Sequence, residues 1–326
     1  MNAALYLTGW RYRAVVLSVV LSALGYLGFS LWGGWRPVSA AVAEVGLAGM
    51  ALALAMSALN YGLRFLRWQV YLHELGHAIP WRPSLRVYLA GFALTTTPGK
   101  AGEALRGVLL QPWNVPWPHS FAAFFSERLS DLLAVTLLTL FGLSLYPEAR
   151  PMIVIGLGLV AVALLVLAQR SLLQRLAQRL PHRPSKLLGA VRHLLRVLQD
   201  AQRCHRPRLL LGLTALSVVA WGAEALAFNW ILGWMGADVP LNFAVFVYAL
   251  AMLAGAVSFM PGGLGGAEAV MVGLLMWKGM NSADAVAATV LIRLATLWFA
   301  VAIGALMLLG ARREQAQAGQ PTQANG

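Results

Sequence analysis

The chain has 326 residues, of which 59% are hydrophobic and only 11% are charged, and its mean hydropathy is +0.68. Because soluble domains carry roughly 25% charged residues, this composition excludes an ordinary soluble protein and predicts an all-α polytopic membrane protein. The formal net charge of +13 does not predict nucleic-acid binding, since the basic residues gather at the ends of apolar runs and in one segment, 169–208.

Apolar runs in chain order predict about six full spans, near 14–32, 41–63, 120–146, 151–169, 209–233 and 284–310. The first follows Arg11 and Arg13 and is long for a signal peptide, so we expect it to be retained. We expect a single membrane domain over 1–310 and a disordered tail over 311–326, which is rich in Gln, Ala and Gly. The one cysteine, Cys204, excludes an intramolecular disulfide bond.

Two further apolar runs are interrupted by proline and glycine. The run 85–110 contains the sequence TTTPGKAGE at 95–103, and the run 241–277 contains MPGGLGGAE at 260–268. Proline removes a backbone donor and glycine weakens a helix, so each run is predicted to break in its middle. Broken backbone at membrane depth needs protein or water beside it, and we therefore expect two re-entrant helical hairpins.

The two breaks belong to an internal repeat. Gly76 and Pro80 recur as Gly236 and Pro240 at an offset of 160 residues. The prolines of the breaks, Pro98 and Pro261, follow at an offset of 163, and the glutamates after them, Glu103 and Glu268, at an offset of 165. Anchors in one order with nearly constant offsets predict two copies of one unit, at about 61–142 and 221–307.

The positive charges predict how the two units are oriented. If Arg11 and Arg13 are cytoplasmic, the segment 169–208, with nine arginines and Lys186 against one acid, falls on the same side, as does the C-terminal end. Both termini are then cytoplasmic, and the two units have opposite orientations. An inverted repeat with broken helices at corresponding positions is typical of transporters with a binding site near the midplane.

Charged residues inside spans are energetically costly and are usually functional. Glu103 and Glu268 each follow a break and each precede an arginine, Arg128 or Arg293, by 25 residues. At the start of a half-helix such a carboxylate meets the positive helix end, where free N–H groups could instead bind a phosphate. The alternative is a set of buried salt bridges that hold the hairpins in the bundle. The candidate substrate-binding set is Arg64, Pro98, Gly99, Lys100, Gly102, Glu103, Arg106, Glu127, Arg128, Asp131, Pro261, Gly262, Gly263, Gly265, Gly266, Glu268 and Arg293.

Other basic residues have a simpler interpretation. Arg67, Arg82 and Arg86, and Arg64 as an alternative to its place in the candidate set, fit orientation charges and lipid-headgroup contacts at the end of the second span. The segment 169–208 is predicted to be a solvated or surface-lying basic helix that contacts anionic lipid headgroups.

The segment 73–77 reads H-E-L-G-H, the pattern of zinc proteases, in which two histidines one helical turn apart bind the metal. A catalytic zinc site needs a third protein ligand, and Gly76 and Pro80 predict that the helix ends here. The corresponding segment of the second unit, 233–237, has no metal ligand. An intramembrane zinc metalloprotease therefore stays as an alternative, and we expect neither a metal nor a cofactor.

The motifs at 64–68, 97–103, 127–131 and 261–268, followed by Arg293, resemble those of the lysylphosphatidylglycerol synthase transmembrane (flippase) family, over nearly the whole chain. The resemblance implies a two-lobed fold with paired re-entrant hairpins in the bacterial cytoplasmic (inner) membrane. It also implies a lipid transporter that moves a phospholipid, or a polyprenyl or hopanoid-type glycolipid, between leaflets through a polar cavity between the hairpins.

Some family members continue into a soluble aminoacyl-transfer domain. This chain stops at Gly326, so their synthase activity is not expected and we do not expect an enzyme. A lipid-headgroup transferase, an accessory protein that presents lipid to a pathway enzyme, and a homo-oligomer stay open.

Overall fold

The computed structural model describes residues 28, 35–96, 103, 106–142, 150–180, 186–258 and 260–318. Every regular element in these ranges is a helix, and none of the described residues lies in a strand. Helices satisfy their backbone hydrogen bonds within the segment, which a bilayer requires. The chain is thus an all-α membrane protein, as its composition predicted.

Three stretches of helix are long and apolar enough to cross a membrane. They are Arg36–Glu74 in α2 (Trp35–Glu74), Pro207–Trp234 (α9), and Ser282–Leu308, which runs through α12 (Ser282–Arg293), η7 (Leu294–Trp298) and into α13 (Phe299–Ala318). A fourth would be α6 (Arg150–Ala168) taken with α7 (Arg170–Arg179), which are bent by 71° relative to each other.

The predicted spans 120–146 and 14–32 are not among these apolar stretches. The run 120–146 corresponds to α5 (Trp117–Thr139) and the short η4 (Leu140–Gly142). It has the length of a span but carries Glu127, Arg128 and Asp131 in its middle, so it is not an ordinary apolar span. The first predicted span, 14–32, lies outside the described residues apart from Gly28.

Helix α2 extends further than predicted. Its backbone departs from helical geometry at Gly46 (φ 66°, ψ 176°), and the helix is then continuous over 47–74, a length of about 42 Å. The prediction that this span ends at 63 rested on the charges of Arg64 and Arg67 and is wrong. The helix continues because both arginines have acidic partners inside the protein.

The second apolar run breaks where the sequence predicted. Helix α10 (Leu241–Val257) ends before the short η6 (Pro261–Gly263), and α11 (Gly266–Trp277) follows. At about 26 Å and 18 Å, both are shorter than the roughly 30 Å hydrocarbon core. The chain doubles back so tightly that a Cβ on Gly263 would lie 3.1 Å from the Cα of Gly255. The re-entrant course of this hairpin through a membrane stays a prediction.

The first apolar run also changes geometry near its predicted break. It contains most of α3 (Trp81–Ala90), all of η1 (Gly91–Leu94) and α4 (Arg106–Leu109), and η3 (Gln111–Trp113) follows it. Of its break, the candidate residues Pro98, Gly99, Lys100 and Gly102 lie outside the described residues. Glu103 is described and is buried.

The offsets of the sequence repeat recur in the backbone. Helices α2 and α9 both end in a turn with a left-handed glycine, Gly76 (φ 92°) and Gly236 (φ 74°), and both turns lead through a proline, Pro80 or Pro240, into the next helix. The hydrogen bond that closes each turn is also shifted by 160 residues, from His77 N to Leu72 O (2.9 Å) and from Ala237 N to Leu232 O (3.0 Å). The opposite orientation of the two units stays a prediction.

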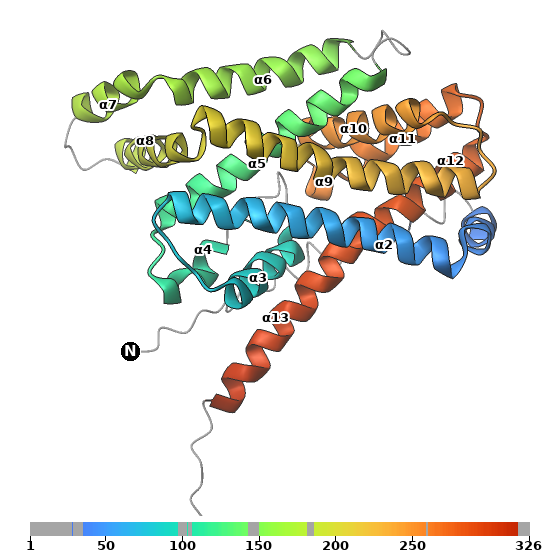
Figure 1. The fold of residues 1–326 in the computed structure, drawn as a ribbon, viewed down its shortest axis with the longest axis horizontal. Coiled ribbons are helices and arrows are strands. Elements are labelled where there is room, and N and C mark those ends of the chain that lie inside the picture. Colours follow the sequence, from blue (N-terminus) through green and yellow to red (C-terminus); the bar gives the residue numbers. More distant parts are fainter. Residues whose placement is uncertain are drawn as a thin grey trace, which may run out of the picture.

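Helices α2 and α9 lie side by side, α5 crosses behind α9 and also contacts α2, and α10 to α12 pack at one end of the bundle (Figure 1). The apolar core has two parts. One is built around Phe228, Phe246 and Leu291 of the second unit. The other is built around Trp68 and Tyr88 of the first unit. The carboxylate of Asp131 is buried where α2, α5 and α9 meet.

The C-terminal helix runs into the predicted tail. Helix α13 continues to Ala318, and the disorder predicted for 311–326 stays a prediction. Residues 319–326 lie outside the described residues.

Candidate functional site

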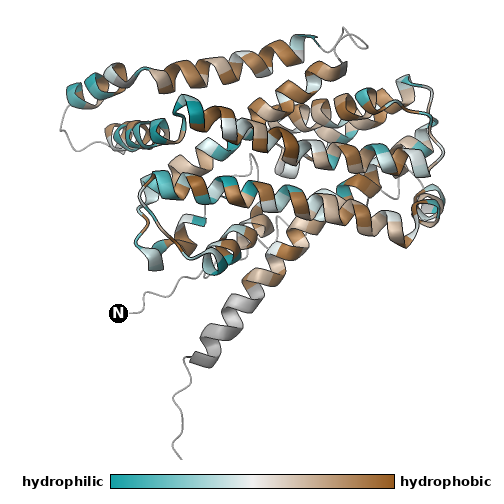
Figure 2. Ribbon diagram, in the orientation of Figure 1, coloured by the Kyte–Doolittle hydropathy of each residue, from teal (hydrophilic) through white to brown (hydrophobic). Residues whose placement is uncertain are grey.

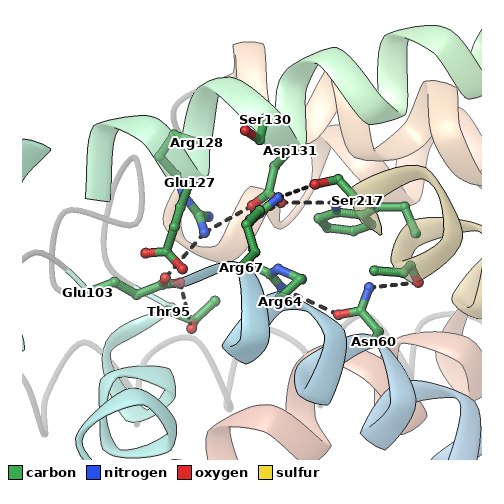
Figure 3. A network of polar contacts seen from close by, with 12 residues as sticks. Asn60, Arg64, Arg67, Thr95, Glu103, Glu127, Arg128, Ser130, Asp131 and Ser217 are labelled. Atoms are coloured by element: carbon green, nitrogen blue, oxygen red, sulfur yellow. Dashed lines mark hydrogen bonds and ion pairs between the residues drawn. The ribbon is translucent and has the colours of Figure 1, made fainter. Parts of the chain in front are cut away.

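Asp131 of α5 is the centre of a buried polar network (Figure 3). Its carboxylate accepts hydrogen bonds from Arg64 (3.1 Å) and Arg67 (2.8 Å) of α2 and from the indole Nε1 of Trp221 of α9 (3.1 Å). Arg128, one turn before it on α5, lies 3.0 Å away. One carboxylate therefore ties together three helices that are distant in sequence.

A second carboxylate cluster lies beside it. Arg106 Nη2 donates to Glu127 Oε2 at 2.5 Å, and Arg106 Nε donates to the backbone carbonyl of Glu103 at 3.0 Å. The Glu103 side chain accepts from the Thr95 hydroxyl at 3.0 Å and lies 3.5 Å from Arg128. Arg128 thus lies between Glu103 and Asp131 and connects the two clusters (Figure 3).

Aromatic rings enclose these guanidinium groups. Arg106 lies over Trp68 and Tyr88, with its Cζ 5.5 and 5.2 Å from the ring centroids. Arg64 lies over Trp221 at 5.2 Å. Such contacts stabilise a cation in a site with little water. The aliphatic stem of Arg106 passes so close to Gly91 that a Cβ there would lie 2.5 Å from its Cδ, so a side chain at that position would displace the arginine.

The network carries an excess of positive charge. Among the described residues it contains four arginines (64, 67, 106 and 128) and three carboxylates (103, 127 and 131), which leaves one formal positive charge. Arg128 is the most accessible arginine, with 21% of its side chain exposed against 7% or less for the others. The buried Nε atoms of Arg64, Arg67 and Arg128 have no hydrogen-bond partner among the described residues. Because its side chain is the most exposed, Arg128 is the member best placed to contact an anionic ligand.

The predicted Glu–Arg pair of the second unit is present. Arg293 Nε donates to Glu268 at 2.7 Å, and Arg293 Nη2 donates to the carbonyl of Gly262 at 2.9 Å. Glu268 also accepts the N–H of Gly265 at 2.6 Å, at the start of α11. The carboxylate therefore binds one N–H group of this helix terminus itself, and phosphate binding there stays a prediction. In this unit the pair links the Pro-Gly break to α12, as the salt-bridge alternative describes.

Two crossed contacts join the units. Tyr61 of the first unit donates its hydroxyl to the carbonyl of Thr296 in η7 of the second, just as Trp221 of the second donates to Asp131 of the first. The two donors are 160 residues apart and the two acceptors 165, which are the offsets of the sequence repeat. A buried carboxylate, Glu224, lies near this boundary and accepts from Tyr248 at 2.5 Å.

The structure gathers the predicted residues into two groups. The described members of the first unit (Arg64, Glu103, Arg106, Glu127, Arg128 and Asp131) form the network around Asp131, and the described members of the second unit (Pro261, Gly262, Gly263, Gly265, Gly266, Glu268 and Arg293) form the break and its salt bridge. Pro98, Gly99, Lys100 and Gly102 lie outside the described residues.

The role of two arginines of α2 in the site was not predicted correctly from the sequence. Arg67 was interpreted as a headgroup contact, as Arg64 was in one alternative, but both are buried among helices and paired with Asp131. A signal was present: Asn60, Arg64, Arg67 and Tyr71 are spaced by four, three and four residues and form one polar stripe on α2. Asn60 donates to the carbonyl of Ala220 in α9 at 2.9 Å. Arg82 and Arg86, in contrast, are exposed.

The H-E-x-x-H segment does not form a helical histidine pair. Helix α2 ends at Glu74, so His73 is helical while His77 lies beyond the turn and bonds His119 of α5 at 2.7 Å. No group of three His, Cys, Asp or Glu side chains suited to a metal ion is present among the described residues. Burial, with the nearby His119 and Arg203, lowers the pKa of His77 below its ordinary value of 6.5.

The chain is similar to known proteins over most of its length. A family model described as "Lysylphosphatidylglycerol synthase TM region" matches residues 15–304. A UPF0104 membrane protein of Pyrococcus horikoshii is 23% identical and aligns with 93% of this chain and 98% of its own length. Two UPF0104 membrane proteins of Methanothermobacter thermautotrophicus are 24% identical over 78% and 91% of this chain and 82% and 92% of their own lengths. This multi-pass membrane protein therefore belongs to the lysylphosphatidylglycerol synthase transmembrane family.

Proposed function

We propose that this protein is a lipid transporter that moves a lipid with an anionic headgroup between membrane leaflets. One observation supports it most: three arginines and three carboxylates are buried among membrane helices, and a fourth arginine beside them, Arg128, is partly exposed. Intramembrane charges of this kind usually mark a substrate path. The family takes its name from a lipid-synthesising enzyme, which agrees with a role in lipid handling.

The headgroup would bind at Arg128. A phosphate accepts two parallel hydrogen bonds from a guanidinium group, and Arg128 has the most exposed side chain of the four arginines in the network. The excess positive charge of the network offsets the charge of a phosphate, so the substrate enters without leaving an unpaired ion. Arg64 and Arg67 hold Asp131 in place, and Asp131 in turn positions Arg128 through their ion pair. The acyl chains would stay in the bilayer while the headgroup crosses.

We further propose what drives the lipid movement and in which membrane the protein lies. The sequence contains no phosphate-binding loop of the ATPase type, so movement would be passive or coupled to an ion gradient. We infer a bacterial cytoplasmic membrane protein with both termini cytoplasmic, in which the broken segments at 95–103 and 260–268 approach the midplane from opposite faces. This role is transport and not catalysis, and the same cavity would serve each leaflet in turn.

The test is lipid movement in proteoliposomes. Full-length protein is reconstituted with a trace of fluorescent phosphatidylglycerol, and dithionite then bleaches the label in the outer leaflet. Arg128→Gln removes the charged contact to the headgroup and is expected to slow movement tenfold or more. Arg82→Gln, an exposed arginine of α3, is the matched control and is expected to leave the rate unchanged.

Two outcomes would contradict the proposal. Equal rates for Arg128→Gln and wild type would refute the assigned headgroup contact. No movement of anionic or zwitterionic lipid by well-folded wild type would refute transport. In that case, co-purified anionic lipid that is lost in Arg128→Gln would support a protein that only presents lipid to a partner enzyme.

A further inference from the structure

Helices α7 and α8 (Lys186–Cys204) form an arm at one end of the spanning helices. Helix α7 turns away from α6 by 71°. Figure 1 shows α8 strongly foreshortened at the end of α9, while α2, α6 and α9 run across the view. Helix α8 is therefore steeply inclined to the spanning helices, which is the direction of a helix lying in the membrane surface.

The arm presents a row of apolar side chains that the protein does not cover. On α8, Leu187, Val191 and Leu194 are spaced by four and three residues and share one face, and they are 74%, 36% and 57% exposed. On α7, Leu172 and Leu176 are four residues apart and are also exposed. Exposed large side chains in a row mark a surface that another phase or molecule covers.

Arginines occupy other faces of the two helices. Arg192, Arg196 and Arg203 of α8 are four and seven residues apart and share a second face, on the opposite side of the helix from the leucines. On α7, Arg175 and Arg179 are four residues apart and lie next to the leucines. Figure 2 shows the resulting alternation of hydrophilic and hydrophobic residues along both helices. Of the described residues in 170–208, nine are cationic and only Asp200 is acidic.

The arm is held in place by the rest of the protein. Helix α8 buries Leu195, Val197, Ala201 and Cys204, and it packs on α5. Side-chain amides add two fixed contacts, from Gln199 to the carbonyl of Leu173 (3.2 Å) and from Gln202 to that of Leu167 (2.8 Å). The exposed row of leucines is thus presented in a fixed direction.

We propose that α7 and α8 lie in the headgroup region of an anionic leaflet, with the leucine row inserted among the acyl chains and the arginines bound to lipid phosphates. An excess of eight positive charges favours an anionic membrane surface over a neutral apolar partner. The inclination of α8 and the amphipathic pattern point to the same surface. This binding is independent of lipid transport, because it uses none of the residues around Asp131.

The first experiment measures the depth of α8. Cys204 is replaced by alanine, and single cysteines at Leu187 or Leu194 carry an environment-sensitive dye in the full-length protein in nanodiscs. Leu211→Cys, on the exposed side of α9, is the control within the membrane, and Asp238→Cys, in an exposed turn, is the aqueous control. We expect lipid-borne nitroxide, but not iodide, to quench the dye at 187 and 194. Quenching by iodide alone would overturn the proposal and point to solvent or a protein partner.

The second experiment measures charge selectivity. The dye at 187 is quenched with nitroxide on phosphatidylglycerol or on phosphatidylcholine, and the anionic lipid is expected to quench more. Replacing Arg192, Arg196 and Arg203 by glutamine is expected to lower the apparent affinity for the anionic lipid on the order of a hundredfold, at about fivefold for each charge. Arg82→Gln is the control, and equal quenching by the two lipids in the wild type would overturn the anionic preference. Elution of each variant as a monodisperse peak shows that it is folded.

Discussion

Replacing Asp131 by asparagine tests whether the buried network is ionic. Asparagine keeps the shape of the side chain but removes the charge that Arg64, Arg67 and Arg128 share. Arg67 is only 1% exposed, so water cannot solvate its guanidinium group. In Asp131→Asn this arginine therefore becomes a buried charge without its carboxylate partner. Breaking a buried ion pair in this way costs about 3–5 kcal/mol. That corresponds to a roughly hundred- to several-thousandfold smaller folding equilibrium constant.

The assay is equilibrium unfolding in mixed micelles of SDS and a mild detergent, followed by tryptophan fluorescence. Asp238→Asn, at an exposed carboxylate in the turn after α9, is the matched control and is expected to change stability by less than about 0.5 kcal/mol. Adding Arg67→Met to Asp131→Asn removes one of the uncompensated charges. The double variant is therefore expected to lose less stability than the sum of the two single variants.

A small effect would refute this account of the network. If Asp131→Asn unfolds at the same SDS fraction as Asp238→Asn, the carboxylate is not charged in the folded protein or its partners reach water. Additive losses in the double variant would show that Arg67 and Asp131 do not interact, although their side chains lie 2.8 Å apart.

Further predictions concern packing and pH. A Cβ on Gly304 would lie 2.1 Å from the backbone N of Ala93, so Gly304→Ala is expected to cost at least about 1–3 kcal/mol in the same unfolding assay. Gly263→Ala, at φ 70° and against the backbone of α10, is expected to lower thermal stability, measured by size-exclusion chromatography after heating. Because the folded protein lowers the pKa of His77, its unfolded state binds more protons. Stability should therefore fall as the pH drops below about 6.5, and His77→Gln should reduce this dependence.

The sequence predicted the helical elements better than their ends. Composition and apolar run length were sufficient for the class, and the prolines and glycines of 260–268 marked a real break between α10 and α11. The end of α2 was placed too early because a charge in an apolar run normally marks the membrane boundary. Arg64 and Arg67 violate that rule since their partner, Asp131, is 67 and 64 residues away. A tertiary contact of this kind leaves no mark in local hydropathy.

The same limit applies to the site. The spacing of Glu103 from Arg128 and of Glu268 from Arg293 predicted one Glu–Arg pair in each unit, and both pairs are within ion-pair distance. The distance between the arginine nitrogen and the glutamate oxygen differs between the pairs: it is 2.7 Å in the second unit and 3.5 Å in the first. Spacing alone does not predict this difference, because it depends on the other groups that compete for each arginine.

The difference between the units bears on how the protein would work. Arg293 is fully used by Glu268 and the carbonyl of Gly262, so the second break is fastened to α12. Arg128 is shared between Glu103 at 3.5 Å and Asp131 at 3.0 Å, and 21% of its side chain is exposed. Under the proposed function, an anion at Arg128 would compete with both carboxylates and loosen the contact between α5 and the segment that carries Glu103. We therefore expect a bound headgroup to rearrange contacts of the first unit, while those of the second unit stay in place.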